Sequence, residues 1–307
     1  MNAKPLLYIL FTIDCEPVAN KSAKQGPKTW EQSARAIEGF CDRLAVMGYP
    51  ATLFVSAACA EEHGPLLEEL AGRNIELGLY VHPPTLAGSR YPRHLGNYTA
   101  TEQHAIIASA TERFYDAIGS RPHSFRSGAF SASDATFQVL YELGFRQGSL
   151  SIPGRDLPRD AVSWSGAETA PHYVNPSDRL RAGALPFLEL PVTSDPDRWY
   201  RRGFPYELCI ENGSVEDWHR PLIEGSLERL EADQAPFRTL GLFTNNGLAY
   251  YRDDGQHSIT LEKLLAYFDT LAGRYDLVPT TLAGAHQHFR QFMAGGETPM
   301  NVLRLGE

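Results

Sequence analysis

Two carboxylates stand at the end of the first apolar segment of the chain. The stretch LLYILFTIDCEP, residues 6–17, runs apolar and then reaches Asp14, Cys15 and Glu16. On a strand the two acids point to the same side, because side chains alternate between faces. Like charges held this close repel and shift each other's pKa, so a metal ion, a nearby arginine or water should offset them. The alternative is that both acids are solvated surface residues.

Two further groups with useful chemistry follow later apolar segments. His82 follows IELGLYV and precedes two prolines, and a neutral imidazole there can bind a metal, although a lone histidine is more often structural. Arg126 lies in SFRSG, where a guanidinium can hold Asp14 ionised through paired hydrogen bonds or can pair with any acid at the rim. With Asp14 as a base and Glu16 as an oxygen ligand, these residue types favour water activated by a metal.

The remaining histidines are given no role in the chemistry. His94, in YPRHLGNY, could fold over the site, and we assign it no function. His104 falls inside an expected surface helix and is interpreted as structural. His286 and His288 lie two apart in the last helix and face different directions, so we expect both to be solvated.

Strand-like and helix-like segments alternate along the whole chain. Apolar runs rich in β-branched and aromatic residues predict strands, and apolar residues at helical spacing predict helices. The expected strands are residues 6–13, 51–57, 75–82, 124–128, 146–152, 187–193, 239–246 and 275–281. The expected helices are residues 29–48, 64–72, 133–144, 214–232 (broken near Pro221), 260–273 and 282–292, with one more beginning at Thr99 or Thr101. Residues 153–186 predict a long loop over one face.

Repeated strand–helix units with strands apolar on both faces predict a parallel sheet covered by helices. About seven units can close into a barrel, in which chemistry lies at the carboxyl ends of the strands. Those ends carry polar groups here, whereas the strand starts carry nothing comparable: Asp14, Glu16, Tyr80, His82, Arg126, Glu189, Thr193, Asn245 and Asn246. The sequence therefore predicts an α/β barrel with one active-site mouth.

The bulk properties exclude several classes of function. The 307 residues carry a formal charge of −9 without a local Lys/Arg cluster, which argues against nucleic-acid binding. No apolar run is long enough for a membrane span, and the start MNAKPLLYILF is interpreted as a core strand of a cytoplasmic protein rather than as a secretion signal. The four cysteines lack C-x-x-C spacing, so they indicate neither a zinc ribbon nor a disulfide scaffold. The oligomeric state is not indicated.

Seven motifs occur in an order that resembles the polysaccharide deacetylase family, also called the NodB-homology domain or carbohydrate esterase family 4. They are Asp14-x-Glu16, ELGLYVHPPTLAG, GNYTATEQ, RPHSFRSGAF, ELGFRQGSLSIPG, LELPVT and LGLFTNN. Within the family, the chain is most similar to the subgroup associated with lipopolysaccharide and O-antigen biosynthesis. The resemblance implies a single domain of residues 1–293 folded as an irregular (β/α)7-type barrel. Residues 294–307 are expected to form a loose C-terminal tail.

The resemblance also implies a mechanism. In the family a metal, commonly zinc, is bound by an acid and two histidines and polarises an N-acetyl group and water. A second acid is the base, an arginine orients it, and a late-strand histidine protonates the leaving amine. Carried over by motif, Asp14 is the catalytic base, Arg126 the orienting arginine, and Glu16 and His82 the metal ligands.

The chain departs from the family pattern at three strand ends. Relatives read G-L-H-x-H-P-P where this chain has Gly78-Leu79-Tyr80-Val81-His82, so Tyr80 stands in place of a histidine ligand. Asn245 stands where the general-acid histidine is expected, and an amide can donate a hydrogen bond but cannot shuttle a proton. Gln147 and Gly148 replace a further expected acid. We interpret Tyr80 and Asn245 as substrate-binding residues.

Two classes of function remain open. The first is a hydrolase that uses a divalent metal, expected to be zinc, to remove an N-acetyl or similar acyl group from a sugar during surface polysaccharide synthesis. The second is a catalytically altered or inactive protein of the same fold that binds carbohydrate, or one that performs metal-free chemistry with Asp14 and Arg126. Both take a carbohydrate ligand, and we favour the first. Both also require the acids, His82 and Arg126 to share one pocket.

Overall fold

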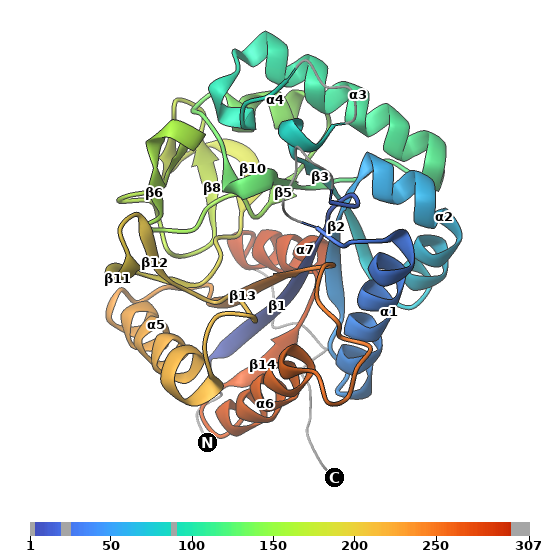
Figure 1. The fold of residues 1–307 in the computed structure, drawn as a ribbon. Helices are drawn as coiled ribbons and strands as arrows, with labels where there is room; N and C mark the ends of the chain where they lie inside the picture. Colours follow the sequence, from blue (N-terminus) through green and yellow to red (C-terminus); the bar gives the residue numbers. More distant parts are fainter. Residues whose placement is uncertain (1–3, 20–25, 87–90, 296–307) are drawn as a thin grey trace.

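The computed structural model describes residues 4–19, 26–86 and 91–295, so all but the first two residues of the expected tail 294–307 lie outside the described residues. Its centre is a ten-stranded sheet in the order β13-β1-β2-β3-β4-β5-β10-β8-β9, with β14 also paired to β1 (Figure 1). The strands are β1 (Leu6–Cys15), β2 (Ala51–Ser56), β3 (Glu76–Val81), β4 (Ser124–Ser127), β5 (Gln147–Gly148), β8 (His172–Asn175), β9 (Asp178–Ala182), β10 (Leu185–Glu189), β13 (Thr239–Asn245) and β14 (Asp276–Pro279).

Helices surround this sheet, and two small hairpins lie beside it. The helices are α1 (Trp30–Val46), α2 (Ala57–Ala71), α3 (Ala100–Ile118), α4 (Thr136–Glu142), α5 (Arg220–Ala232), α6 (Gln256–Leu271) and α7 (Leu282–Met293). The hairpins are β6 (Asp156–Leu157) with β7 (Val162–Ser163), and β11 (Ser194–Arg201) with β12 (Phe204–Glu207). No helix in the described ranges combines the length and apolar composition needed to cross a membrane.

The central strands run parallel, as predicted. β1 pairs in parallel with β13, β14 and β2, and the parallel pairing continues through β3, β4, β5 and β10. Asp14 lies opposite Asn245 in the β1–β13 register, and Tyr80 lies opposite Arg126 in the β3–β4 register. The carboxyl ends of these strands therefore meet at one edge, where the chemistry was expected.

The barrel is not closed by a continuous ladder of strands. β13 and β10 have no strand pairing with each other among the described residues. The chain after β10 reaches β13 instead, because the backbone nitrogen of Thr193 donates to the Gly241 carbonyl (3.0 Å) and the Gly241 nitrogen donates to the Thr193 hydroxyl (3.0 Å). The α/β prediction is thus confirmed, with an open rather than a sealed ring.

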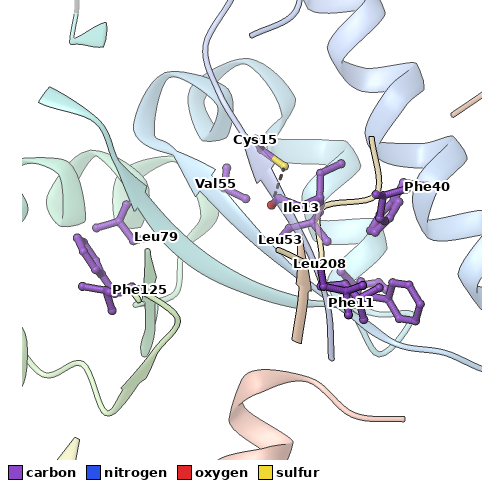
Figure 2. Close-up of a cluster of buried hydrophobic side chains, with 14 of the residues drawn as sticks. Phe11, Ile13, Cys15, Phe40, Leu53, Val55, Leu79, Phe125 and Leu208 are labelled. Carbon is purple, nitrogen blue, oxygen red and sulfur yellow. Dashed lines mark hydrogen bonds between the residues drawn. The ribbon is translucent and has the colours of Figure 1, made fainter. Parts of the chain in front are cut away.

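Alternation along β1 divides its side chains between two cores. The odd-numbered residues face the helical layer, and Figure 2 shows three of them, Phe11, Ile13 and Cys15, near Leu53 and Val55 of the neighbouring strand β2. Leu79 and Phe125 continue the same core on β3 and β4. Tyr8 and Leu10 belong to a second core with Leu188 of β10 and with α7. Asp14 shares their face, whereas the thiol of Cys15 is buried in the helical layer. Cys15 is therefore a core residue between two site residues.

Capping residues explain where several helices begin. The Thr99 hydroxyl accepts from the Glu102 nitrogen (3.4 Å) and Glu102 accepts from the Thr99 nitrogen (2.9 Å), a reciprocal pair that starts α3 at Ala100. Of the two expected starts, Thr99 is the correct one. The hydroxyl of Ser56 likewise accepts from the Cys59 nitrogen, so α2 begins seven residues before the expected position 64.

The expected loop of residues 153–186 is the least accurate prediction. This stretch holds β6, β7, β8, β9 and the start of β10. β8 and β9 are antiparallel and extend the sheet past β10. Their alternation is weak, since β9 is half-buried to exposed along its length, so the sequence carries little apolar signal there. The strand expected just before this stretch, residues 146–152, is shorter in the structure and spans Gln147–Gly148.

Candidate active site

A pocket of about 630 Å³ lies at the carboxyl end of β1. Asp14 and Glu16 line it, together with Tyr80 from β3 and Asn245 from β13. Five carboxylates are among the described residues that line this pocket: Asp14, Glu16, Asp160, Glu207 and Glu211. The structure thus brings Asp14, Glu16, Tyr80 and Asn245 to one pocket, whereas Arg126 and His82, which were expected to share it, are not among its lining residues.

Arg126 holds Asp14 in place. Its Nη1 donates to Asp14 Oδ1 (2.9 Å) and to the Thr12 hydroxyl (2.8 Å), and its Nε and Nη2 donate to the carbonyl (2.9 Å) and hydroxyl (2.8 Å) of Ser149. The guanidinium lies 4.2 Å from the centre of the Phe54 ring and is completely buried. Burial raises the pKa of Asp14 above its ordinary value, and the attraction and hydrogen bond of Arg126 oppose that rise. The predicted pairing of these two residues is present.

Glu16 has a different environment from Asp14. Tyr80 donates its hydroxyl hydrogen to Glu16 Oε1 (2.9 Å), while Glu16 Oε2 is buried without a partner among the described residues. Burial, reinforced by the charge of Asp14, raises the pKa of Glu16 to about 7, although the hydrogen bond from Tyr80 lowers it. The two carboxylates, two positions apart, therefore have different partners: a guanidinium for Asp14 and a phenol for Glu16.

Asn246, rather than Asn245, fixes the end of β1. Its Oδ1 accepts from the Glu16 nitrogen (3.0 Å), and its Nδ2 donates to the Glu16 carbonyl (3.0 Å) and the Ser33 hydroxyl (2.8 Å). Asn246 is fully buried. This amide pair holds the backbone of Glu16, so the carboxylate is positioned from both sides.

The amide of Asn245 is already engaged by the protein. Its Nδ2 donates to Glu211 Oε1 (2.9 Å), and its Oδ1 accepts from the Gly247 nitrogen (2.9 Å). The Thr244 hydroxyl donates to the second oxygen of Glu211 (3.0 Å). Asn245 does line the pocket, as its predicted role requires, but its polar atoms serve mainly to hold Glu211.

His82 lies behind the wall of the pocket. It is not among the residues lining the pocket, and it packs so closely on Gly128 that a Cβ at Gly128 would meet the imidazole. Its ring stacks on His94 with centroids 5.2 Å apart, and neither ring nitrogen has a partner among the described residues. Burial, with the neighbouring His94, lowers the pKa of His82 to about 4, so the imidazole is neutral.

His94, and not His82, is the histidine that lines the pocket. Its Nε2 lies 3.7 Å from Asp160 Oδ1. Burial lowers its pKa, and the charge of Asp160 opposes that change. A loop residue such as His94 has no periodic signal in the sequence, so only the tertiary fold places it at the pocket.

The described residues do not fit the zinc site that the motif predicted. Nowhere in the described part of the chain do three or more His, Cys, Asp or Glu side chains form a group that could hold a metal ion. Tyr80, in the place of a histidine, keeps its hydroxyl hydrogen, because burial and the charges of Glu16 and Asp14 raise its pKa well above 10. A protonated phenol already donating to Glu16 is a poor third ligand. The prediction of zinc is not confirmed, and no chemical step is derived through a metal.

The residues that the sequence did not single out lie on the far side of the pocket. Arg155 pairs with Glu207 through Nη2 (2.5 Å) and Nε (3.2 Å), and both side chains are buried. Glu207 is the last residue of the β11–β12 hairpin, and Glu211 follows it. The sequence pattern predicted no helix or strand for this part of the chain. An acid in a loop carries no periodicity, so only its position in space marks it.

Comparisons with known proteins agree with this architecture. Residues 24–148 match the family model described as polysaccharide deacetylase. A candidate polysaccharide deacetylase from Mycobacterium smegmatis has 16% identity and a TM-score of 0.62, over 100% of this chain and 96% of that one. The Puue allantoinase has 14% identity and a TM-score of 0.62, over 95% and 92%. A candidate polysaccharide deacetylase from Pseudomonas aeruginosa PAO1 has 13% identity and a TM-score of 0.60, over 93% and 91%.

At these identities the solved structures show a shared fold. No curated protein matches the chain. The family model covers the segment that carries α1 to β5, including Tyr80, His82 and Arg126, and the fold is shared over almost the entire length. The chain therefore shares the fold of solved polysaccharide deacetylases, and residues 24–148 match the model of that family.

Proposed function

We propose that the protein hydrolyses an amide, an N-acetyl or similar N-acyl group, on a sugar. One observation carries the proposal: in the same pocket, the base Asp14 is held by Arg126, while Glu16 beside it is held by Tyr80 and has a pKa near neutral. Hydrolysis of an amide needs a proton acceptor for water and a proton donor for the leaving amine. Two carboxylates in different environments can divide these roles.

In the proposed reaction, Asp14 takes a proton from water as the water oxygen attacks the acyl carbon. Glu16 gives the proton on its Oε2 to the amide nitrogen as the carbon–nitrogen bond breaks. The products are a carboxylic acid and an amine, and solvent returns the proton from Asp14 to Glu16. Tyr80 donates to the other oxygen of Glu16, so it orients the carboxyl and leaves Oε2 for the proton.

The lining of the pocket supports a neutral or amino sugar as the substrate. Among the described residues that line it, five are carboxylates and one is a permanent cation, Arg155, which is already paired with Glu207. Such a pocket disfavours sugars bearing phosphate or carboxylate, and it favours the ammonium group of a deacylated product. Its volume of about 630 Å³ suits one or two sugar rings, and Tyr200, Phe204 and Phe243 supply aromatic surface.

The proposed setting is surface polysaccharide synthesis in the cytoplasm, as in the lipopolysaccharide and O-antigen subgroup that the motifs resemble. The order of the seven motifs supports this placement. Carbohydrate is the proposed partner, and the pocket, with its negative lining, does not suit nucleic acid.

Acetate release from N-acetylhexosamine mono- and disaccharides tests the proposal. We expect Asp14→Asn and Glu16→Gln each to lower kcat by about 10²–10⁴-fold while the sugar still binds. The exposed acid Glu38, on α1, offers a matched control, and Glu38→Gln should leave the rate unchanged. Saturable sugar binding without any release of acid from N-acyl sugars would instead establish the binding-only alternative.

A further inference from the structure

A second cavity lies at the opposite end of the barrel from Asp14. It has a volume of about 760 Å³ and is open on one side; we call it the amino-end groove. Arg146 and Arg290 line it, together with Tyr141, Tyr173, His286 and Gln287. Arg146 directly precedes β5, which runs parallel to the other central strands, so the groove lies at the amino ends of the strands. α7, which carries Arg290, is seen at the centre of the ring of strands in Figure 1, and its first residues donate to the side chains of Thr52 and Glu76 near the amino ends of β2 and β3.

The charge of the amino-end groove is opposite to that of the protein. The chain has a formal charge of −9, yet none of the described residues that line this groove is acidic. Both Arg146 and Arg290 are exposed, and within the described residues neither forms an ion pair. Two cations in one concave site of an acidic protein, with no acidic partner among the described residues, produce a local field that attracts anions.

The two guanidinium groups act on the same place. Burial, then Arg290 and Arg146, lowers the pKa of His286 to about 4. Arg290 also acts on the Tyr173 hydroxyl. Both arginines line the same cavity as His286, so their positive charges act on one shared space.

The walls of the groove are held by hydrogen bonds. Neutral His286 donates from Nδ1 to Gln147 Oε1 (2.8 Å) and accepts from the Tyr173 hydroxyl at Nε2 (3.4 Å). Gln147 donates in turn to Ser124 (2.8 Å). His286 is 9% exposed, so the expectation that it is solvated was wrong. Its hydrogen bond to Gln147 at the start of β5 keeps the imidazole buried. A site built in this way needs little rearrangement to bind a ligand.

Arg146 is likewise positioned in advance. Its Nη1 donates to the carbonyls of Tyr141 (3.0 Å) and Phe145 (2.7 Å), and its guanidinium lies 4.4 Å from the centre of the Tyr141 ring. These contacts leave the N–H groups of Nε and Nη2 without partners among the described residues. A guanidinium with such an edge matches the paired oxygens of a phosphate.

We propose that the amino-end groove binds a small molecule bearing a phosphate monoester. Two guanidinium groups suit a dianion better than a single carboxylate. The cavity has room for a group the size of a monosaccharide on the phosphate, and the rings of Tyr141 and Tyr173 can contact it. This site is separate from the acidic pocket, so the inference does not depend on the proposed hydrolase activity.

Calorimetric titration of the full chain tests the inference without an activity assay. The probes are inorganic phosphate, glucose 1-phosphate and AMP, each in low salt at neutral pH, with glucose as the uncharged control. We expect saturable binding of at least one phosphate and none of glucose, and a decrease in affinity as salt rises. Comparing the three phosphates tells free phosphate from a phosphate carried on a sugar or a nucleoside.

Variants locate the binding. Arg146→Gln and Arg290→Gln should each weaken it by about tenfold or more, because each removes a charged donor pair. Arg181→Gln, at an exposed arginine of β9 outside the groove, should leave it unchanged. Arg146→Lys and Arg290→Lys, which keep the charge, should lie between. Absence of saturable binding, or equal weakening by Arg181→Gln, would overturn the inference.

Discussion

Replacing Glu16 by Gln tests whether this carboxyl is protonated in the native protein or is ionised and bound to a cation. In the structure Glu16 has a pKa of about 7 against an ordinary 4.5, chiefly because it is buried. A carboxyl whose pKa is raised on folding stabilises the protein fully below about pH 4.5, and this contribution is lost as the pH rises to about 7. The two pKa values differ by about 2.5, which at ~1.36 kcal/mol for each pKa unit gives about 3 kcal/mol.

Glutamine resembles the protonated carboxyl, since its Oε1 can accept from Tyr80 and its amide replaces the hydroxyl at Oε2. The variant should therefore equal the wild type in free energy of unfolding at pH 4.5, and should exceed it by up to about 3 kcal/mol at pH 8. Glu189 has a similarly raised pKa of about 7 and titrates in both proteins, so only the difference between them isolates Glu16.

Denaturant unfolding between pH 4.5 and 8.5, followed by tryptophan fluorescence, measures this difference. Glu38→Gln is the matched control, because Glu38 is exposed, and its curve should follow the wild type at every pH. If Glu16→Gln is instead less stable than the wild type throughout, by an amount that does not vary with pH, then Glu16 is ionised and bound in the native protein. Our account of its pKa would then be wrong, and a bound cation would be the better explanation.

Three further outcomes follow from the same site. Arg126→Met should lower the free energy of unfolding by about 3–5 kcal/mol, because it leaves buried Asp14 without its partner. Adding Asp14→Asn to the same chain should recover part of this loss in a double-mutant cycle, whereas additive losses would show that the pair is not coupled. Tyr80→Phe removes a hydrogen bond that lowers the pKa of Glu16, so the pH profile of kcat/KM should move to higher pH, and an unmoved profile would separate Tyr80 from the titrating group. Dialysis against EDTA should leave acetate release and the melting temperature unchanged; one zinc per chain by elemental analysis, lost in Glu16→Ala together with activity, would contradict the assignment of the two acids.

The fold could be predicted from the hydrophobic pattern of the sequence. Apolar strands and amphipathic helices repeat along the chain, and a parallel sheet covered by helices is the arrangement that buries both kinds of surface. Alternation along β1 was enough to place Asp14 and Glu16 on one face, and the order of the motifs indicated the family whose model matches residues 24–148. The pairing of Arg126 with Asp14 was also predictable, because both residues lie near the carboxyl ends of strands in one parallel sheet.

Tertiary contacts decided the rest of the site. His82 was expected to be a ligand from its place at a strand end, but close packing on Gly128 and stacking on His94 put it behind the pocket wall. Loop residues such as Glu211 reached the site without any sequence signal, because loops have no period to read. The proton on Glu16 likewise depends on burial, which is a property of the folded chain and not of the residue. The sequence determined which strands would form and which way their side chains would alternate; packing determined which side chains reach the pocket and what charge they carry there.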